Sequence, residues 1–183
     1  MLSGINSVVN LSILSGQSLA SCSDIVTDDL TALGLEANQA SDFVDKLAST
    51  ITRSNTNVEL YGYALTQCGA QAGTLGVNVT DLNTAIGLMA NAGVKGSKAG
   101  MSLKNMLANM AAPTDKMEAA LKKLGMTADE TGSYLKTTAD GNVDLAATCK
   151  TLMSAMNGME KSQKVALLTA IVGKNAAPGI LAM

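Results

Sequence analysis

Four glycines in this sequence each lie between a predicted helix end and an apolar residue. They occur in the tripeptides Leu33-Gly34-Leu35, Leu75-Gly76-Val77, Ala92-Gly93-Val94 and Leu124-Gly125-Met126. Glycine adopts the left-handed conformation at no steric cost, and an apolar residue after it packs back on the last helical turn, as in a Schellman motif. Four such stops predict a compact all-α assembly of short helices. The four glycines are irregularly spaced along the chain and therefore predict no solenoid repeat.

Apolar residues recur between these stops at intervals of three and four, the spacing that forms a stripe along one side of a helix. The first stripe comprises Leu19, Cys22, Val26, Leu30 and Leu33, and the second comprises Ala40, Phe43, Leu47 and Ile51. Asn57 is predicted to cap a third helix, and Asn78 or Thr80 a fourth. The same spacing predicts further helices over residues 99–110, 115–124, 145–156 and 165–172.

Residues 127–143 depart from the helical pattern. Gly132 and an Asp140-Gly141 turn lie among threonine and tyrosine residues, which predicts a small β-hairpin near residues 130–143. A lone hairpin is marginally stable in water, so we expect this one to pack on helices.

The length of 183 residues suits a single domain. We interpret residues 1–14 as the end of a preceding helix or a linker, and residues 15–183 as one helical core domain. The apolar segment 176–183 ends abruptly, which indicates a fragment of a longer polypeptide. The N-terminal segment lacks the basic start of a secretion signal, so we expect no cleaved leader. No apolar run approaches the roughly 20 residues of a membrane-spanning helix.

Signals for catalysis are weak. The chain has no histidine, which excludes Ser-His-Asp and Cys-His mechanisms and histidine metal sites. Its three cysteines, Cys22, Cys68 and Cys149, have no metal-ligand spacing and are interpreted as reduced core thiols. Glu59 beside Tyr61 and Tyr63 is the one carboxylate arrangement that merits consideration, but an exposed acid near a helix start explains it better. We therefore predict a protein that is not an enzyme, with no catalytic, cofactor-binding or metal site.

Three lysines, Lys95, Lys98 and Lys104, lie at or after the glycine corner at residue 93. The segment does not match a phosphate-binding loop, because Ser97 precedes Lys98 and the segment follows a helix. Three lysines without interleaved aromatic residues give no basis for sequence-specific nucleic-acid binding. The charge is nevertheless uneven: residues 1–90 carry a net −6 and residues 91–183 a net +4. Oppositely charged patches of this kind favour head-to-tail contacts, although two solvated faces explain them more simply.

The corner segment also resembles a known signature. Residues 88–100 read LMANAGVKGSKAG and residues 110–114 read MAAPT, in the order typical of the core region of phage tail tape measure proteins. Ser23 to Asp28, SNTNV at 54–58 and VGKNAAPG at 172–179 are similar to three further blocks of that family. The resemblance covers roughly residues 15–183. Val172 and Lys104 depart from it, since the family usually has Phe and often has Arg at these positions.

The resemblance implies a structural role in the virion tail. Proteins of this family occupy the tail tube during assembly, set its length and leave ahead of the genome. The implied partners are tail tube and tail tip or baseplate proteins, with self-association as a further option, and the implied locations are the virion tail and, during assembly, the host cytoplasm. The alternative is a membrane-active helical domain that assists DNA passage into the host cell and contacts the membrane during ejection. Helices that lie in a membrane interface usually carry Lys or Arg on one face and Trp or Phe as anchors. These residues are scarce on the predicted helix faces, so the sequence favours this alternative less than the structural role.

Overall fold

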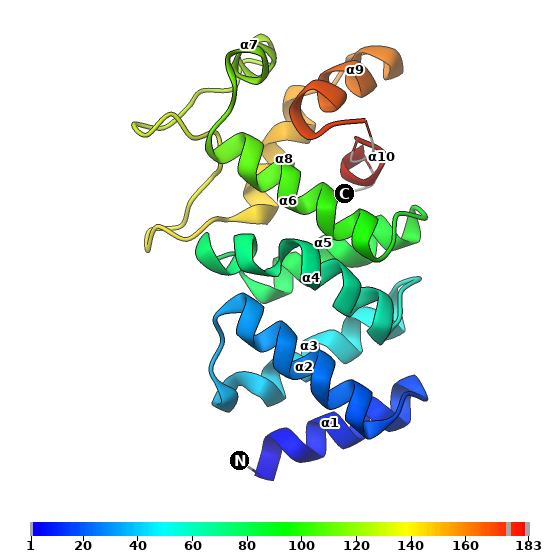
Figure 1. Ribbon diagram of the computed structural model, residues 1–183. Coiled ribbons are helices and arrows are strands. Elements are labelled where there is room, and N and C mark those ends of the chain that lie inside the picture. The colour runs from blue at the N-terminus through cyan, green and yellow to red at the C-terminus, as the bar shows by residue number, and fades with distance from the viewer. Residues whose placement is uncertain (1, 175–176, 182–183) are drawn as a thin grey trace.

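The computed structural model describes residues 2–174 and 177–181, and within them the chain is all-α, as predicted (Figure 1). No β-strand occurs in these residues. The elements are α1 (Leu2–Ser15), α2 (Leu19–Leu33), a short 3-10 turn η1 (Ala37–Gln39), α3 (Ala40–Arg53), α4 (Val58–Thr74), α5 (Val79–Asn91), α6 (Ser97–Ala111), α7 (Asp115–Lys123), α8 (Leu145–Ala155), α9 (Lys161–Val172) and α10 (Ala177–Leu181).

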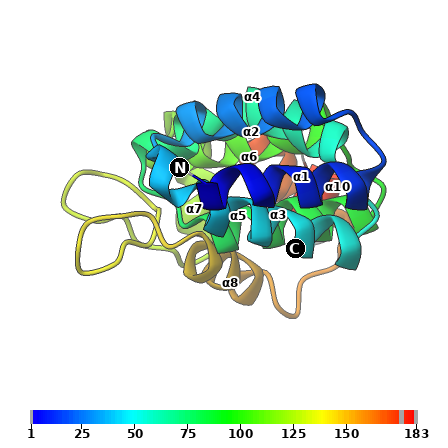
Figure 2. The same ribbon diagram turned by 90° about the horizontal axis from the view of Figure 1, so that it is seen from below.

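The helices form a stack of two rows. The first row consists of α2, α4 and α6, which pack side by side through the most extensive contacts between elements, and the second row consists of α1, α3 and α5 (Figure 1). Figure 2 views the stack from one end, where α1 lies alongside and contacts both α2 and α3. At the other end α8 packs on α5, while α9 and α10 pack on α6.

Helix starts in this stack recur at a constant interval. The first-row helices begin at Leu19, Val58 and Ser97, and the second-row helices α3 and α5 begin at Ala40 and Val79. The resulting 39-residue repeat was missed in the sequence because the glycine stops end helices of different rows and different lengths. The helix starts recur every 39 residues, whereas the glycine stops do not. An interval of this size is typical of stacked helical pairs.

Buried positions follow the same 39-residue interval. All five residues buried on α2 have buried counterparts on α4: Cys22, Val26, Asp29, Leu30 and Leu33 correspond to Tyr61, Leu65, Cys68, Gly69 and Ala72. The three residues buried on α3 likewise correspond to buried residues of α5: Phe43, Val44 and Leu47 correspond to Leu82, Asn83 and Ile86. Residues 19–57 and 58–96 are therefore two copies of one structural unit.

The four predicted glycine stops are confirmed as Schellman motifs. Gly34, Gly76, Gly93 and Gly125 all have positive φ. In each motif the N–H of the following apolar residue bonds back to the helix, as when Leu35 donates to Leu30 O at 2.9 Å and Val94 donates to Met89 O at 2.9 Å. The predicted caps are confirmed as well, since the side chains of Asn57 and Asn78 accept backbone N–H groups of α4 and α5.

The predicted hairpin is short, with two cross-strand backbone bonds and one bridge, and the bond farther from its turn joins Asp144 N–H to Lys136 O at 2.8 Å. Thr138 N–H donates to Asn142 O at 2.8 Å around Gly141, and Thr137 and Val143 form one antiparallel bridge. The flanking backbone also bonds to helical elements: Val143 N–H donates to Leu75 O, Tyr134 N–H to Met110 O and Lys136 N–H to Thr148 Oγ1. These bonds dock the loop on the stack.

The N-terminal segment predicted as a helix end or linker contains α1, whose Leu11 is buried in the common core. The division of the chain at residue 15 stays a prediction. In the apolar segment 176–183, residues 177–181 form α10, and the remaining positions lie outside the described residues. Two predicted stripe residues, Leu19 and Val165, are exposed rather than buried.

Glycine permits the close approach of α4 and α6, so Gly100→Ala tests the stack. A Cβ at Gly100 would lie 2.0 Å from the carbonyl oxygen of Ala64, a backbone atom that moves only with α4 itself. We expect a loss of stability at or above the upper end of the roughly 1–3 kcal/mol typical of overpacking, measured by urea denaturation.

The matched control is Gly4→Ala on α1, where the added Cβ would meet its nearest neighbour, Ala40 Cβ, at an ordinary 3.6 Å. This change should be neutral or stabilising by up to about 1 kcal/mol, because alanine has the higher helix propensity. Equal stability of the two variants would contradict the close packing of α4 and α6.

Candidate functional site

Three acidic side chains line a depression between α2 and α4. Its volume is about 340 Å³, and its lining comes from the start of α2, the middle of α2 and one side of α4. The lining residues are Gln17, Ser21, Ile25, Asp28, Asp29, Glu59, Gly62, Tyr63 and Thr66. Gly62 leaves room for Ile25, whose side chain would lie 3.1 Å from a Cβ at this position.

Asp29 is a carboxyl group buried beside this depression. It is 3% exposed, and its Oδ2 has no hydrogen-bond partner among the described residues. Burial, followed by the neighbouring charge of Asp28, raises its pKa from 3.8 to about 8. Asp29 is therefore mainly protonated at neutral pH, because an ionised carboxylate would lose its hydration there without gaining a partner.

Polar groups of α4 and α5 lie on the interior side of Asp29. Tyr61 Oη donates a hydrogen bond to Asn83 Oδ1, whereas Asn83 Nδ2 has no partner among the described residues. Burial raises the pKa of Cys68 to about 12, and the charge of Asp29 adds to this shift. A thiol with that pKa is not a nucleophile at neutral pH. The interpretation of Cys22, Cys68 and Cys149 as reduced core thiols is confirmed, since all three are free and buried.

The structure brings Glu59 together with Tyr63 but not with Tyr61. Tyr63 Oη donates a hydrogen bond of 2.9 Å to Glu59 Oε1 across one helical turn, and this bond raises the pKa of Tyr63. Tyr61 points into the core, where its ring lies 6.3 Å from that of Phe43. The Glu59–Tyr63 pair is exposed, and its partners are satisfied by each other, as in an ordinary surface pair.

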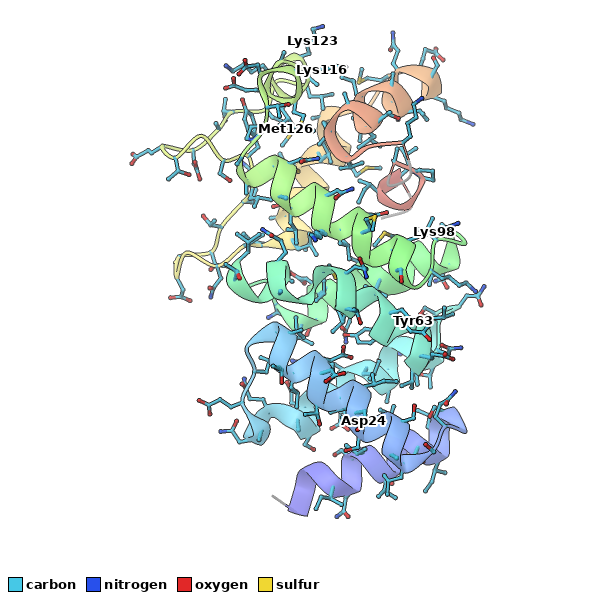
Figure 3. The ribbon with its side chains drawn as sticks, viewed as in Figure 1. Asp24, Tyr63, Lys98, Lys116, Lys123 and Met126 are labelled. Atoms are coloured by element: carbon cyan, nitrogen blue, oxygen red, sulfur yellow. The ribbon has the colours of Figure 1, made fainter. Side chains whose placement is uncertain are left out.

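The three predicted lysines do not form one surface. Lys95 is half-buried in the corner between α5 and α6, whereas Lys98 and Lys104 are exposed on α6. Lys98 lies near the start of α6 (Figure 3). It borders a second hollow with Lys174 and Pro178 between α6 and the C-terminal helices. Lys104 comes later on the same helix, and its place in the sequence sets it about 120° away from Lys98 around the helix axis. The sequence predicted these residues as a group, but the helical rotation separates them.

Sequence reasoning missed a further hollow between α5 and α8. It measures about 490 Å³ and is mainly apolar, with Ala85, Leu88, Leu145 and Met153 in its lining. Its walls come from helices far apart in the sequence, so no local pattern could indicate it. Across residues 2–174 and 177–181, no group of three His, Cys, Asp or Glu side chains could hold a metal ion. A search of the same residues finds no helix long and apolar enough to cross a membrane.

The pKa of Asp29 predicts an unusual pH dependence of stability. The folded state keeps its proton up to about pH 8, whereas the unfolded state releases it near pH 3.8, so unfolding releases a proton between these values. The free energy of unfolding should therefore fall as the pH rises through this window, by at most about 1.4 kcal/mol for each pH unit. Asp29→Asn should abolish this fall and be more stable than the wild type above about pH 8 in urea denaturation.

Asp24→Asn is the control, because Asp24 is an exposed acid on the same helix. It should keep the wild-type pH dependence. A wild type whose stability is constant between about pH 5 and pH 8, or an Asp29→Asn variant with an unchanged slope, would contradict the buried neutral carboxyl group.

Comparison with known proteins shows that the sequence is similar to phage tail proteins. A model of the phage-related minor tail protein family matches residues 1–173. The chain is also similar to a tape measure protein of Pneumococcus phage Dp-1, with 30% identity over 177 residues, or 96% of this chain. The chain spans about 15% of the length of that relative. No solved structure matches the chain.

These matches confirm the resemblance drawn from the corner segment, and they cover most of the helical stack. Since the family match extends from residue 1 to residue 173, the chain belongs to the phage-related minor tail protein family, whose members are structural proteins of the phage tail.

Proposed function

We propose that this chain is a folded module of a tape measure protein, acting in tail assembly, in determination of tail length and in genome ejection. The observation that carries the proposal is the 30% identity to the tape measure protein of phage Dp-1 over 96% of this chain. The acidic depression supports a structural role, because Asp29 is buried and mainly protonated at neutral pH and Glu59 is paired with Tyr63.

The stack favours a module over a ruler. A continuous helix rises about 1.5 Å per residue, so the whole chain would span about 275 Å if it were fully extended in one helix. Here Schellman stops end α2, α4, α5 and α7, and α1 to α6 pack into two rows instead. In this account, sequence outside residues 1–183 measures the tube, and this part serves as a terminal or initiator module within the core domain assigned to residues 15–183.

The partners that fit this role are tail tube proteins and tail tip or baseplate proteins, with self-association as a further option. The protein would lie in the virion tail, and in the host cytoplasm during assembly. No observation favours the alternative of a membrane-active domain that contacts the membrane during ejection, and neither catalysis nor sequence-specific nucleic-acid binding forms part of the proposed role.

Deletion of one structural unit tests the role in tail length. We expect a phage lacking residues 58–96 of this module to build tails whose length changes by much less than the roughly 58 Å that the same stretch would span as one straight helix. The control is an in-frame deletion of equal length from a segment of the same polypeptide outside this chain that is predicted to be one continuous helix. That deletion should shorten the tail by about 58 Å, measured by electron microscopy of purified virions.

Two results would count against the proposal. Equal shortening by both deletions would mean that residues of this module measure the tail directly. Tails of unchanged length in both phages would contradict the tape measure role itself.

The basic residues of α6 and its preceding corner give a test of partner binding. We expect the combined change of Lys95, Lys98 and Lys104 to Glu to lower the yield of complete tails if an acidic neighbour contacts any of these separated lysines. Complementation of a phage that lacks the gene measures this yield, and the same charge reversal at Lys116, Lys122 and Lys123 on α7 is the control. Normal tail yield from the first variant would remove this contact from the account.

A further inference from the structure

The 39-residue unit extends to α1. This helix lies in the second row beside α3, as α3 lies beside α5, and each residue of α1 corresponds to the residue one unit later in the chain. The Ser7 Oγ–Ser41 Oγ hydrogen bond of 2.8 Å and the contact between Gly4 and Ala40 join α1 to α3. Thus α1 takes the place of the second helix of a unit, and no first-row helix of that unit lies among the described residues.

Positions that the complete units bury are open at this end of the stack. Ile5 corresponds to Val44 and Asn83, which are 2% and 3% exposed, yet Ile5 is 57% exposed. Leu19 at the start of α2 corresponds to Val58 at the start of α4, and their exposed fractions are 49% and 0%. Helix α4, which carries the buried Val58, has α2 packed beside it, whereas none of the described first-row helices packs on the outer side of α2.

Charged side chains are absent from this exposed end of the stack. The first charged side chain of the chain is Asp24, so α1 and the first turn of α2 carry none. Ile13 and Leu14 are also exposed, but they correspond to Thr52 and Arg53, which face solvent in a complete unit, so they do not belong to this face. A helix that faces solvent normally carries charged residues on its outer side, and an uncharged apolar face of this kind indicates an occupant.

We propose that the face formed by Ile5 and Leu19 binds a further helix of the same structural unit, contributed by the tail polypeptide from outside residues 1–183. This helix would occupy the first-row position next to α2 and would cover α1 as α2 covers α3. Its chemistry follows from the face: an amphipathic helix with an uncharged apolar stripe at intervals of three and four. The proposal uses the proposed function only for the source of the helix, since the related tape measure protein is several times longer than this chain.

Thiol labelling tests the proposal at two positions. Ile5→Cys and Leu19→Cys each place a thiol on the face, and Val165→Cys places one at an exposed position of α9 outside the repeated units. The native thiols Cys22, Cys68 and Cys149 are buried and provide a slow background. Each variant is labelled with a maleimide in the isolated chain and in the complete purified tail polypeptide, after circular dichroism has established that it is folded.

We expect all three introduced thiols to react rapidly in the isolated chain. In the complete polypeptide, those at positions 5 and 19 should react at least roughly tenfold more slowly, whereas the one at position 165 should be unchanged. Equal rates at positions 5 and 19 in both proteins would overturn the proposal, as would slowing at position 165 to the same degree. Protection that already occurs in the isolated chain and grows with its concentration would also overturn it and assign the face to a second copy. None of these outcomes depends on tail length, so they are separate from the test of the tape measure role.

Discussion

The first row of helices depends on backbone contacts that a larger side chain would prevent. A Cβ at Gly100 would lie 2.0 Å from Ala64 O, and one at Gly73 would lie 2.9 Å from Leu33 O. These glycines let α2, α4 and α6 approach closely enough to form the most extensive helix contacts in the chain. The second row packs under this surface, and the burial of Asp29 next to α4 is a consequence of the same approach.

The elements of this fold could be predicted where their signals are local. A Schellman stop needs only a glycine and the apolar residue after it, and a cap needs one Asn, so the ends of α2, α4 and α5 were evident from the sequence. Their stacking depends on contacts between segments one structural unit apart, and unequal helix lengths conceal this interval. The hairpin was predicted as two strands because its turn is evident, whereas the backbone bonds of Val143 and Tyr134 to the helices are not.

The candidate site was predictable only in part. Asp29 lies three residues after Val26 and four before Leu33, which places it on the buried stripe of α2. The spacing therefore indicates a buried acid at this position. The sequence could not indicate that no partner among the described residues reaches its Oδ2. The sequence suggested a site at Glu59 because two tyrosines lie close to it. In the helix Tyr61 points into the core, whereas Glu59 and Tyr63 form a hydrogen-bonded pair on the surface.

Small-angle X-ray scattering combined with light scattering on the isolated chain tests most directly whether these residues are a folded module. A compact monomer of this length has a radius of gyration of about 16 Å, and the elongated stack should lie only slightly above this value. A single continuous helix of the same chain would instead give roughly 80 Å. A monomer near the first value is the predicted result, and a monomer near the second would contradict the folded stack and make these residues part of the ruler.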